Sequence, residues 1–175
     1  DVTGFNIYDR KTNEFVLKTG PIVANILLAD EINRAVPRTQ SSLLEAMEEY
    51  QITIDGESIK LPEPFLVLAT QNPVEQEGTF ILPEAQLDRF LMKISMGYPS
   101  ELGERQILIT HGSANPLLSL KPVCTVEDVI ALQAKCTDVK VSPILQEYIV
   151  KLIRATRKHE SILLGASPRA SLALQ

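Results

Sequence analysis

Two acidic residues end a run of aliphatic side chains in the segment NILLADEI, residues 25–32. Asp30 supplies the kind of carboxylate oxygen that Mg²⁺ prefers as a ligand. Glu31, one residue further on, is suited to orient or deprotonate a water molecule for attack on phosphorus. Acids after a buried strand also begin ordinary turns, so the pair by itself indicates a magnesium-and-water site only weakly.

A second apolar segment, PFLVLATQNP, ends in Thr70, Gln71 and Asn72. Ligands of open parallel sheets bind outside the carboxyl ends of the strands. If the two segments are neighbouring strands, the acid pair and the amide of Asn72 share one crevice. An asparagine side chain both donates and accepts hydrogen bonds, which suits it to hold a water molecule beside a phosphate. Asn72 before Pro73 is also a good turn residue on its own account.

Two arginines are further candidates for contact with an anion. Arg89 lies on a short predicted helix, PEAQLDRFLM, where an arginine is ordinarily solvated or ion-paired. Arg169 follows Ser167-Pro168 and falls in the first turn of a predicted helix. That end of a helix already carries partial positive charge, so an arginine there is better explained if an anion approaches it.

The elements that would position these residues follow from hydrophobic patterns. Alternation around polar turns predicts two hairpins, one over residues 5–17 and one over 51–61 with Asp55-Gly56 as its turn. Continuous apolar character predicts parallel strands that are buried on both faces. The predicted strands are ANILLAD, PFLVLA and MKISMGYP, and the predicted helices between or after them are VPRTQSSLLEAMEE, PEAQLDRFLM and the segment 100–112. This alternation indicates an α/β region over residues 1–112.

Only helices are predicted beyond a proline- and serine-rich connector, SANPLLSLKPVC. Thr125 and Asp128 form a capping box for one helix, Ser142-Pro143 opens a second, and Ser167-Pro168 opens a third. Residues 113–175 are therefore expected to form a helical unit. The third helix stops at the chain end and the first residue is not methionine, so we expect a piece of a longer chain.

Composition argues against some partners. The chain has 175 residues, a net charge of −5 and a pI of about 5.1, so no bulk basic field attracts nucleic acid or an anionic membrane. No apolar stretch is long enough for a spanning helix. Cys124 and Cys136 lack metal-ligand spacing and are expected to be buried or half-buried free thiols. We predict a cytoplasmic protein with no nucleic-acid partner and no membrane span.

Taken in order, these segments resemble a MoxR-type AAA+ ATPase, a family associated with methanol dehydrogenase regulation. The resemblance is carried by residues 20–49, 52–100 and GASPRASLAL, and it extends through nearly the whole chain. It implies the C-terminal part of a P-loop NTPase-like AAA+ parallel-sheet core, followed by an incomplete α-helical lid. It also implies ATP and Mg²⁺ as cofactors, and ATP hydrolysis that drives chaperone-like remodelling or maturation of partner proteins.

The resemblance assigns roles to individual residues. Asp30 corresponds to the Walker B aspartate that holds magnesium, and Glu31 to the catalytic glutamate. Asn72 resembles the sensor-1 residue, which contacts the γ-phosphate and the attacking water. Arg89 in LDRF resembles an arginine finger acting on the ATP of a neighbouring subunit. Arg169 in GASPRA resembles sensor 2, so the anion near it would be the triphosphate.

The resemblance also implies partners. Own subunits in a hexameric ring are expected for the full-length protein, and protein clients are expected, with von Willebrand factor A-domain proteins as candidates. The hairpin over 5–17 resembles the helix-2 insert and that over 51–61 the pre-sensor-1 hairpin. Such hairpins line the ring pore or contact clients in related machines, although both could merely extend the sheet.

One departure from the family pattern bears on activity. The chain contains no Gly-Lys pair, and therefore no glycine-rich phosphate loop with its lysine. Without that loop most of the binding energy for ATP is missing, so the fragment alone is expected to be inactive. Two alternatives stay open: a non-catalytic interaction module that binds through its hairpins, and a chelatase-type AAA+ subunit, which shares LDRF.

Overall fold

The computed structural model describes residues 2–72, 78–111 and 116–175. Its contacts divide the chain into two compact units, Asp1–Leu91 with Lys140–Gln175, and Met92–Val139. The contacts thus group the last two helices with the α/β core, whereas the sequence suggested a boundary at residue 112. The division into 1–112 and 113–175 stays a prediction.

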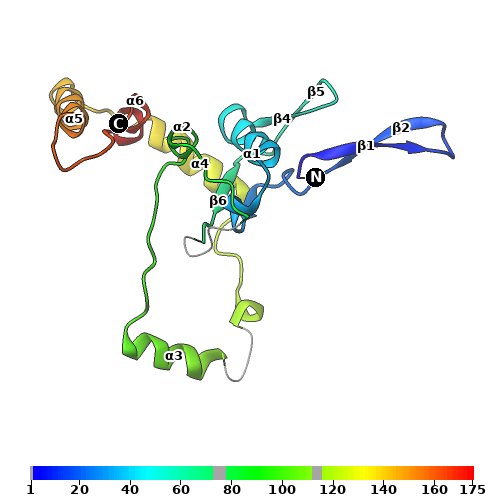
Figure 1. Ribbon diagram of the computed structural model, residues 1–175, viewed down its shortest axis with the longest axis horizontal. Helices are drawn as coiled ribbons and strands as arrows, with labels where there is room; N and C mark the ends of the chain where they lie inside the picture. Colours follow the sequence, from blue (N-terminus) through cyan, green and yellow to red (C-terminus); the bar gives the residue numbers. More distant parts are fainter. Residues whose placement is uncertain (1, 73–77, 112–115) are drawn as a thin grey trace. The chain divides into compact units, whose positions relative to one another are not determined.

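Both predicted hairpins are present (Figure 1). Strands β1 (Gly4–Asp9) and β2 (Glu14–Thr19) pair antiparallel, as do β4 (Gln51–Ile54) and β5 (Glu57–Lys60). Asp55 and Gly56 have φ values of +50° and +88°, which is the left-handed pair that a tight two-residue hairpin turn requires.

The base of the first hairpin is fixed by two glycines. A Cβ on Gly4 would lie 2.3 Å from the Lys18 carbonyl oxygen, and one on Gly20 would lie 2.1 Å from the Val2 carbonyl oxygen. The rest of the hairpin has little contact with the core, and all six residues of β2 are exposed. Only glycine therefore fits where the two strands leave the core.

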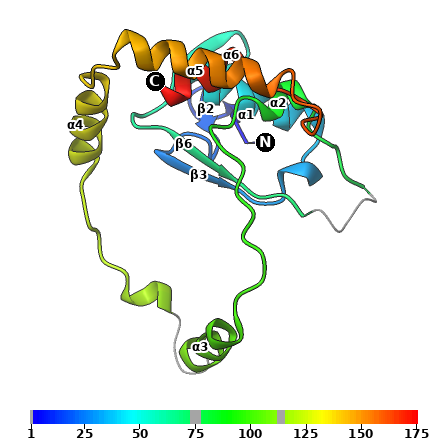
Figure 2. The same cartoon turned by 90° about the vertical axis from the view of Figure 1, so that its left-hand side faces the viewer.

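The two chemistry-bearing segments form neighbouring parallel strands, as predicted. Strand β3 (Ile26–Ala29) pairs with β6 (Leu66–Ala69), with Ile26 opposite Leu66 and Ala29 opposite Ala69 (Figure 2). The expectation of burial on both faces is wrong. Ile26, Leu28, Leu66 and Leu68 are 51–64% exposed, because the described part of the chain covers only the opposite face.

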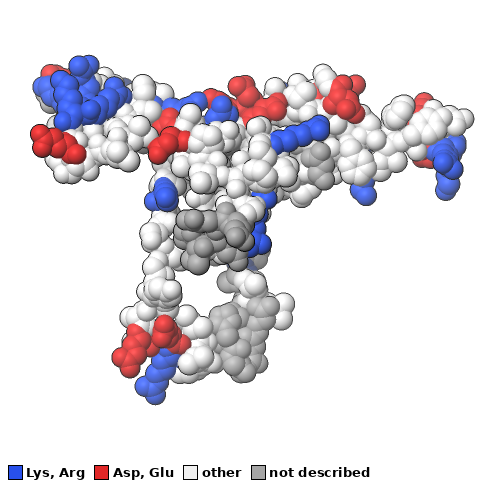
Figure 3. Space-filling view, in the orientation of Figure 1, with Lys and Arg blue, Asp and Glu red and all other residues white. Residues whose placement is uncertain are grey.

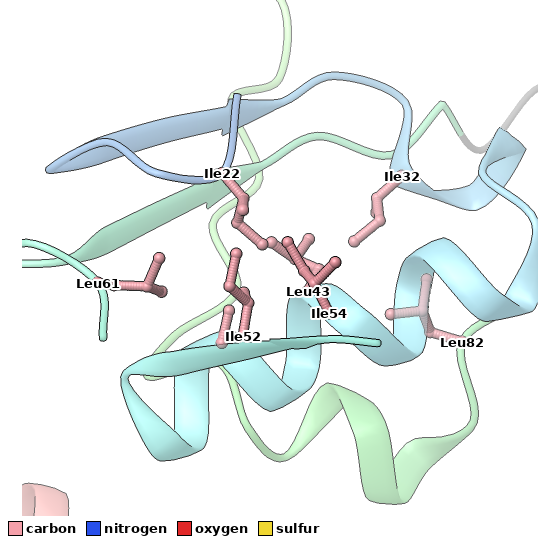
Figure 4. Close-up of a cluster of buried hydrophobic side chains, with 8 residues drawn as sticks. Ile22, Ile32, Leu43, Ile52, Ile54, Leu61 and Leu82 are labelled. Carbon is pink, nitrogen blue, oxygen red and sulfur yellow. The ribbon is translucent and has the colours of Figure 1, made fainter. Parts of the chain in front are cut away.

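That covered face packs on α1 (Pro37–Glu49), which begins with proline at its first position. Leu43, Leu44 and Ala46 are buried on the inner side of this helix, as expected for an apolar stripe at helical spacing. The core joins α1 to η1, β4 and neighbouring loop residues (Figure 4); its buried members are Ile22, Ile32, Leu43, Ala46, Ile52, Ile54, Leu61 and Leu82. The core therefore lies directly beside the carboxyl ends of β3 and β6.

The remaining elements are helical. In chain order they are η1 (Ile32–Arg34), α2 (Glu84–Leu87), α3 (Glu101–His111), η2 (Pro116–Ser119), α4 (Val126–Thr137), α5 (Pro143–Thr156) and α6 (Pro168–Leu174). The predicted capping box of α4 is present, with Thr125 and Asp128 bonded reciprocally. The hydrogen bonds from the backbone and side chain of Thr125 hold the pKa of Asp128 below its usual value.

Two expectations for Met92–Val139 are wrong. Residues 92–99 form no strand, and Met96 and Tyr98 are 91% and 98% exposed. A strand needs a neighbouring main chain to bond with, and the described part of this unit has no strand. Cys124 and Cys136 are free, as predicted, but exposed rather than buried. Part of the predicted connector, residues 113–115, lies outside the described residues.

No described helix has both the length and the apolar character needed to cross a membrane.

Truncating a buried side chain of the core should destabilise the protein. Leu43 is 3% exposed, so Leu43→Ala should lower the free energy of unfolding by about 2–5 kcal/mol through lost burial and a cavity. Leu102 on α3 is 79% exposed, and Leu102→Ala serves as the control, with an expected change within about 0.5 kcal/mol. Urea unfolding followed by circular dichroism measures both. Equal losses in the two variants would contradict this description of the core.

Candidate functional site

The acidic pair and Asn72 meet at the carboxyl edge of the parallel sheet. Asp30 follows directly after β3 and Thr70 directly after β6, and the Thr70 N–H donates to the Ala29 carbonyl at 3.0 Å. Strand pairing therefore continues to the point where the polar residues begin. The register of β3 and β6 brings residues some 40 positions apart in sequence into one site, as the sequence predicted.

The side chain of Thr70 links both acids. Its hydroxyl donates to Asp30 Oδ1 at 2.5 Å, and its oxygen accepts the backbone N–H of Glu31 at 2.8 Å. The Thr70 carbonyl accepts the N–H of Ile32 at 3.0 Å. The sequence marked Thr70 only as a polar residue at this edge. Its role as a clamp between the strands was missed, because spacing along the chain does not show a side-chain bond across two strands.

Glu31 occupies a strained backbone position. Its φ and ψ are +48° and +51°, the left-handed region, at the start of η1. Such a conformation costs a non-glycine residue about 1–3 kcal/mol and recurs at functional sites. The hydrogen bonds on either side, from Glu31 and Ile32 to Thr70, hold it in place.

The carboxylate of Glu31 lies between an arginine and an amide. Arg34 Nε is 3.1 Å from Oε2, and Asn72 Nδ2 is 3.5 Å from Oε1. The backbone carbonyl of Asn72 accepts a hydrogen bond from Asn33 Nδ2 at 3.2 Å, so Asn72 is held from both its side chain and its main chain. Arg34 was not anticipated, although its position three residues after Glu31 on a helical turn was a usable signal. Pro73, which the sequence placed in the same turn, lies outside the described residues.

Arg89 and Arg169 come together at a different place, on Glu48. Arg89 Nη1 is 2.8 Å from Glu48 Oε2, and Arg169 Nη2 donates to Glu48 Oε1. The anion next to Arg169 in this structure is thus the carboxylate of Glu48. The sequence predicted an anion near Arg169 but did not identify Glu48, and the prediction that a triphosphate binds there stays a prediction. The signal for Glu48 was available: an acid in the last turn of a helix opposes the helix dipole.

The site at the sheet edge suits one magnesium ion with few protein ligands. In the described residues no group of three or more His, Cys, Asp or Glu side chains is placed to hold a metal. Magnesium commonly keeps several waters and is bound by one or two carboxylates together with substrate phosphates. The exposed carboxylate of Asp30, fixed by the Thr70 hydroxyl, fits that pattern.

Comparisons with known proteins identify the family and the fold. Residues 1–92 match the family described as "ATPase family associated with various cellular activities (AAA)". A crystal structure from Cytophaga hutchinsonii, of a protein described as a candidate ATPase, superposes with a TM-score of 0.86 at 41% identity. It covers 99% of this chain and 56% of that one.

Three relatives, two of them with MoxR names, are similar to this chain over about half or nearly all of its length. The chaperone MoxR1 of Mycobacterium tuberculosis is 45% identical over 183 residues, which cover 99% of this chain and 48% of that protein. YeaC of Bacillus subtilis is 54% identical over 174 residues, which cover 99% and 54%. The protein MoxR of Methylorubrum extorquens is 35% identical over 98 residues, which cover 53% and 28%.

The chain spans about half the length of the first two relatives. The family match covers residues 1–92, which include Asp30, Glu31 and Asn72. The chain belongs to the AAA+ ATPases and is of the MoxR type.

Proposed function

We propose that these 175 residues supply the hydrolytic part of an ATPase site in a larger protein that remodels client proteins. One observation carries this proposal: Asp30, Glu31 and Asn72 lie together at the carboxyl edge of β3 and β6, with Glu31 on a strained backbone. A carboxylate for a metal, a second for water and an amide beside them are the groups that orient a water molecule for attack on a phosphoryl group.

Each residue has a defined task in the proposed reaction. Asp30 would hold Mg²⁺, which neutralises charge on the phosphate oxygens when bound. Glu31 orients a water molecule and accepts its proton as the oxygen attacks the γ-phosphorus. The bond from that phosphorus to the ADP oxygen breaks, and inorganic phosphate leaves. Asn72 holds the attacking water and a γ-phosphate oxygen in line.

The phosphate-binding part of the site would come from outside this chain. No Gly-Lys pair is present, so the backbone cradle and lysine that fix the triphosphate are not supplied by these residues. We expect the 175-residue chain alone to show no measurable ATP hydrolysis. Normal turnover by the isolated chain would contradict this division of the site.

Both arginines are proposed to contact ATP. Arg89 would act as an arginine finger on ATP held by a neighbouring subunit of a hexameric ring. Arg169 would sense the nucleotide and transmit its presence to the helices around it. A guanidinium group suits this task because it keeps its charge and binds phosphate oxygens through two N–H groups at once.

The first hairpin is proposed to bind the partner proteins that the ATPase acts on as clients. Strand β2 is exposed along its whole length. Phe15 is 73% exposed, and its ring meets that of Tyr8 edge-on with the ring centroids 5.3 Å apart. Exposed aromatic side chains are typical of protein contact surfaces.

ATP as substrate and two unpaired cysteines favour a cytoplasmic location.

Replacing the proposed base should separate binding from hydrolysis. In the full-length protein, Glu31→Gln keeps the size of the side chain but cannot accept the proton of water. Turnover should fall about 10²–10⁴-fold while ATP binding is retained. Phosphate release and binding of a fluorescent ATP analogue measure the two quantities. Glu104→Gln, at an exposed position of α3, is the matched control. Full turnover in Glu31→Gln would remove Glu31 from this role.

If Arg89 acts on the ATP of a neighbouring subunit, mixing two inactive variants should restore activity. Arg89→Ala should lower turnover about 10³–10⁵-fold, whereas the exposed control Arg105→Ala on α3 should not. Mixed oligomers of Arg89→Ala and Glu31→Gln subunits should regain activity, because some interfaces join an intact Glu31 to an intact Arg89. Phosphate release from defined mixtures tests this, and mixtures as inactive as their components would exclude action between subunits.

A further inference from the structure

Glu48 lies in the last turn of α1, where a negative charge is unfavourable. The C-terminal end of a helix carries partial negative charge, and no basic residue occupies this turn of α1. Arg169 has the opposite mismatch, because it lies in the first turn of α6, whose end is partially positive. The two residues pair with each other, so each offsets the mismatch of the other.

The carboxylate of Glu48 binds one arginine through each of its oxygens. Oε2 lies 2.8 Å from Nη1 of Arg89, and Oε1 accepts a hydrogen bond from Nη2 of Arg169. The Leu44 carbonyl accepts a second bond from Arg89 Nη1 at 3.2 Å. Asp88 Oδ2, 3.7 Å from Arg169 Nη1, is the most distant of these partners. Both guanidinium groups are therefore aligned on a single carboxylate.

This cluster is open to solvent. The side chains of Arg89, Glu48 and Arg169 are 32%, 36% and 47% exposed, and with Met47 they line a cavity of about 140 Å³. In Figure 3, basic and acidic side chains adjoin over the region where α1, α2 and α6 lie in Figure 1. Ion pairs as exposed as these contribute little to stability, so stability is a weak reason for placing two arginines on one carboxylate.

We propose that Glu48 is a positioning residue, which holds Arg89 and Arg169 in place and releases each of them to the ATP that it contacts. This inference rests on the proposed function, in which both arginines contact ATP. Glu48 cancels one of the two positive charges, and Asp88 faces Arg169 only at 3.7 Å. A triphosphate offers more oxygens and more negative charge to either guanidinium group. Side chains that are already ordered lose less freedom when they bind the new anion.

Two opposite effects follow for the kinetics. Glu48 aligns the arginines, so its loss lowers kcat. Glu48 also competes with the triphosphate for those arginines, so its loss does not weaken ATP binding. A residue that served only to stabilise the fold would instead lower the amount of active protein and leave the kcat of each folded molecule unchanged.

The test uses the full-length protein and compares Glu48→Gln with Glu49→Gln. Glu49 lies in the same helical turn and makes no ion pair or hydrogen bond among the described side chains, so the two variants lose the same charge. In Glu48→Gln we expect kcat to fall about tenfold or more, KM for ATP to stay the same or fall, and the thermal unfolding midpoint to stay close to wild type. Glu49→Gln should match wild type in all three.

A second variant keeps the test decisive if Glu48→Gln folds poorly. Glu48→Asp keeps the charge but is one methylene shorter, so one carboxylate no longer reaches both arginines well, and kcat should lie between wild type and Glu48→Gln. Wild-type kcat in both Glu48 variants would overturn the positioning role while leaving the ATPase intact. A raised KM with unchanged kcat would also overturn it. If the full-length wild type itself hydrolysed no ATP, the proposed function would fail instead.

Discussion

The parallel pairing of β3 with β6 is the constraint on which the site depends. Four residues of each strand are in register, and the last hydrogen bond, from Thr70 to Ala29, lies directly before the acids. Because side chains alternate along a strand, a slip of one residue would turn the Thr70 hydroxyl away from Asp30. The apolar face toward α1 fixes that register, so the hydrophobic core sets the geometry of the polar site.

Much of this was predictable from residue patterns. Continuous apolar segments indicated the two strands, their polar ends indicated the site, and Asp55-Gly56 indicated a hairpin. Burial on both faces of the sheet, and a strand over 92–99, were not correct. Burial of a sheet face depends on the element that covers it, and strand formation depends on a neighbouring strand to pair with. The residues of a segment do not identify either of these elements. An apolar pattern shows which surface is costly to expose to water, but not whether the described chain covers it.

The charged residues show a similar limit. Arg169 at a helix N-terminus indicated that an anion was required, and the structure supplies Glu48, 121 residues earlier in the chain. Asp30, Glu31 and Asn72 were predicted to lie together and do so, whereas the bridging hydroxyl of Thr70 and the ion pair of Arg34 were not. Spacing along helices and strands identifies charged residues at unfavourable positions. It does not identify their partners, because those partners lie far away in the sequence and only the folded structure brings them close.

The first hairpin combines a rigid base with an outer strand, β2, that is exposed along its whole length. Gly4 and Gly20 leave no room for a side chain at the base, so the direction in which the hairpin leaves the core is fixed. Beyond it, β2 buries none of its residues, so its sequence can change without disturbing the core. Substitutions on β2 are therefore expected to change the free energy of unfolding little, so this strand can vary among relatives. For protein engineering, the same property makes it a suitable place to graft a new recognition sequence.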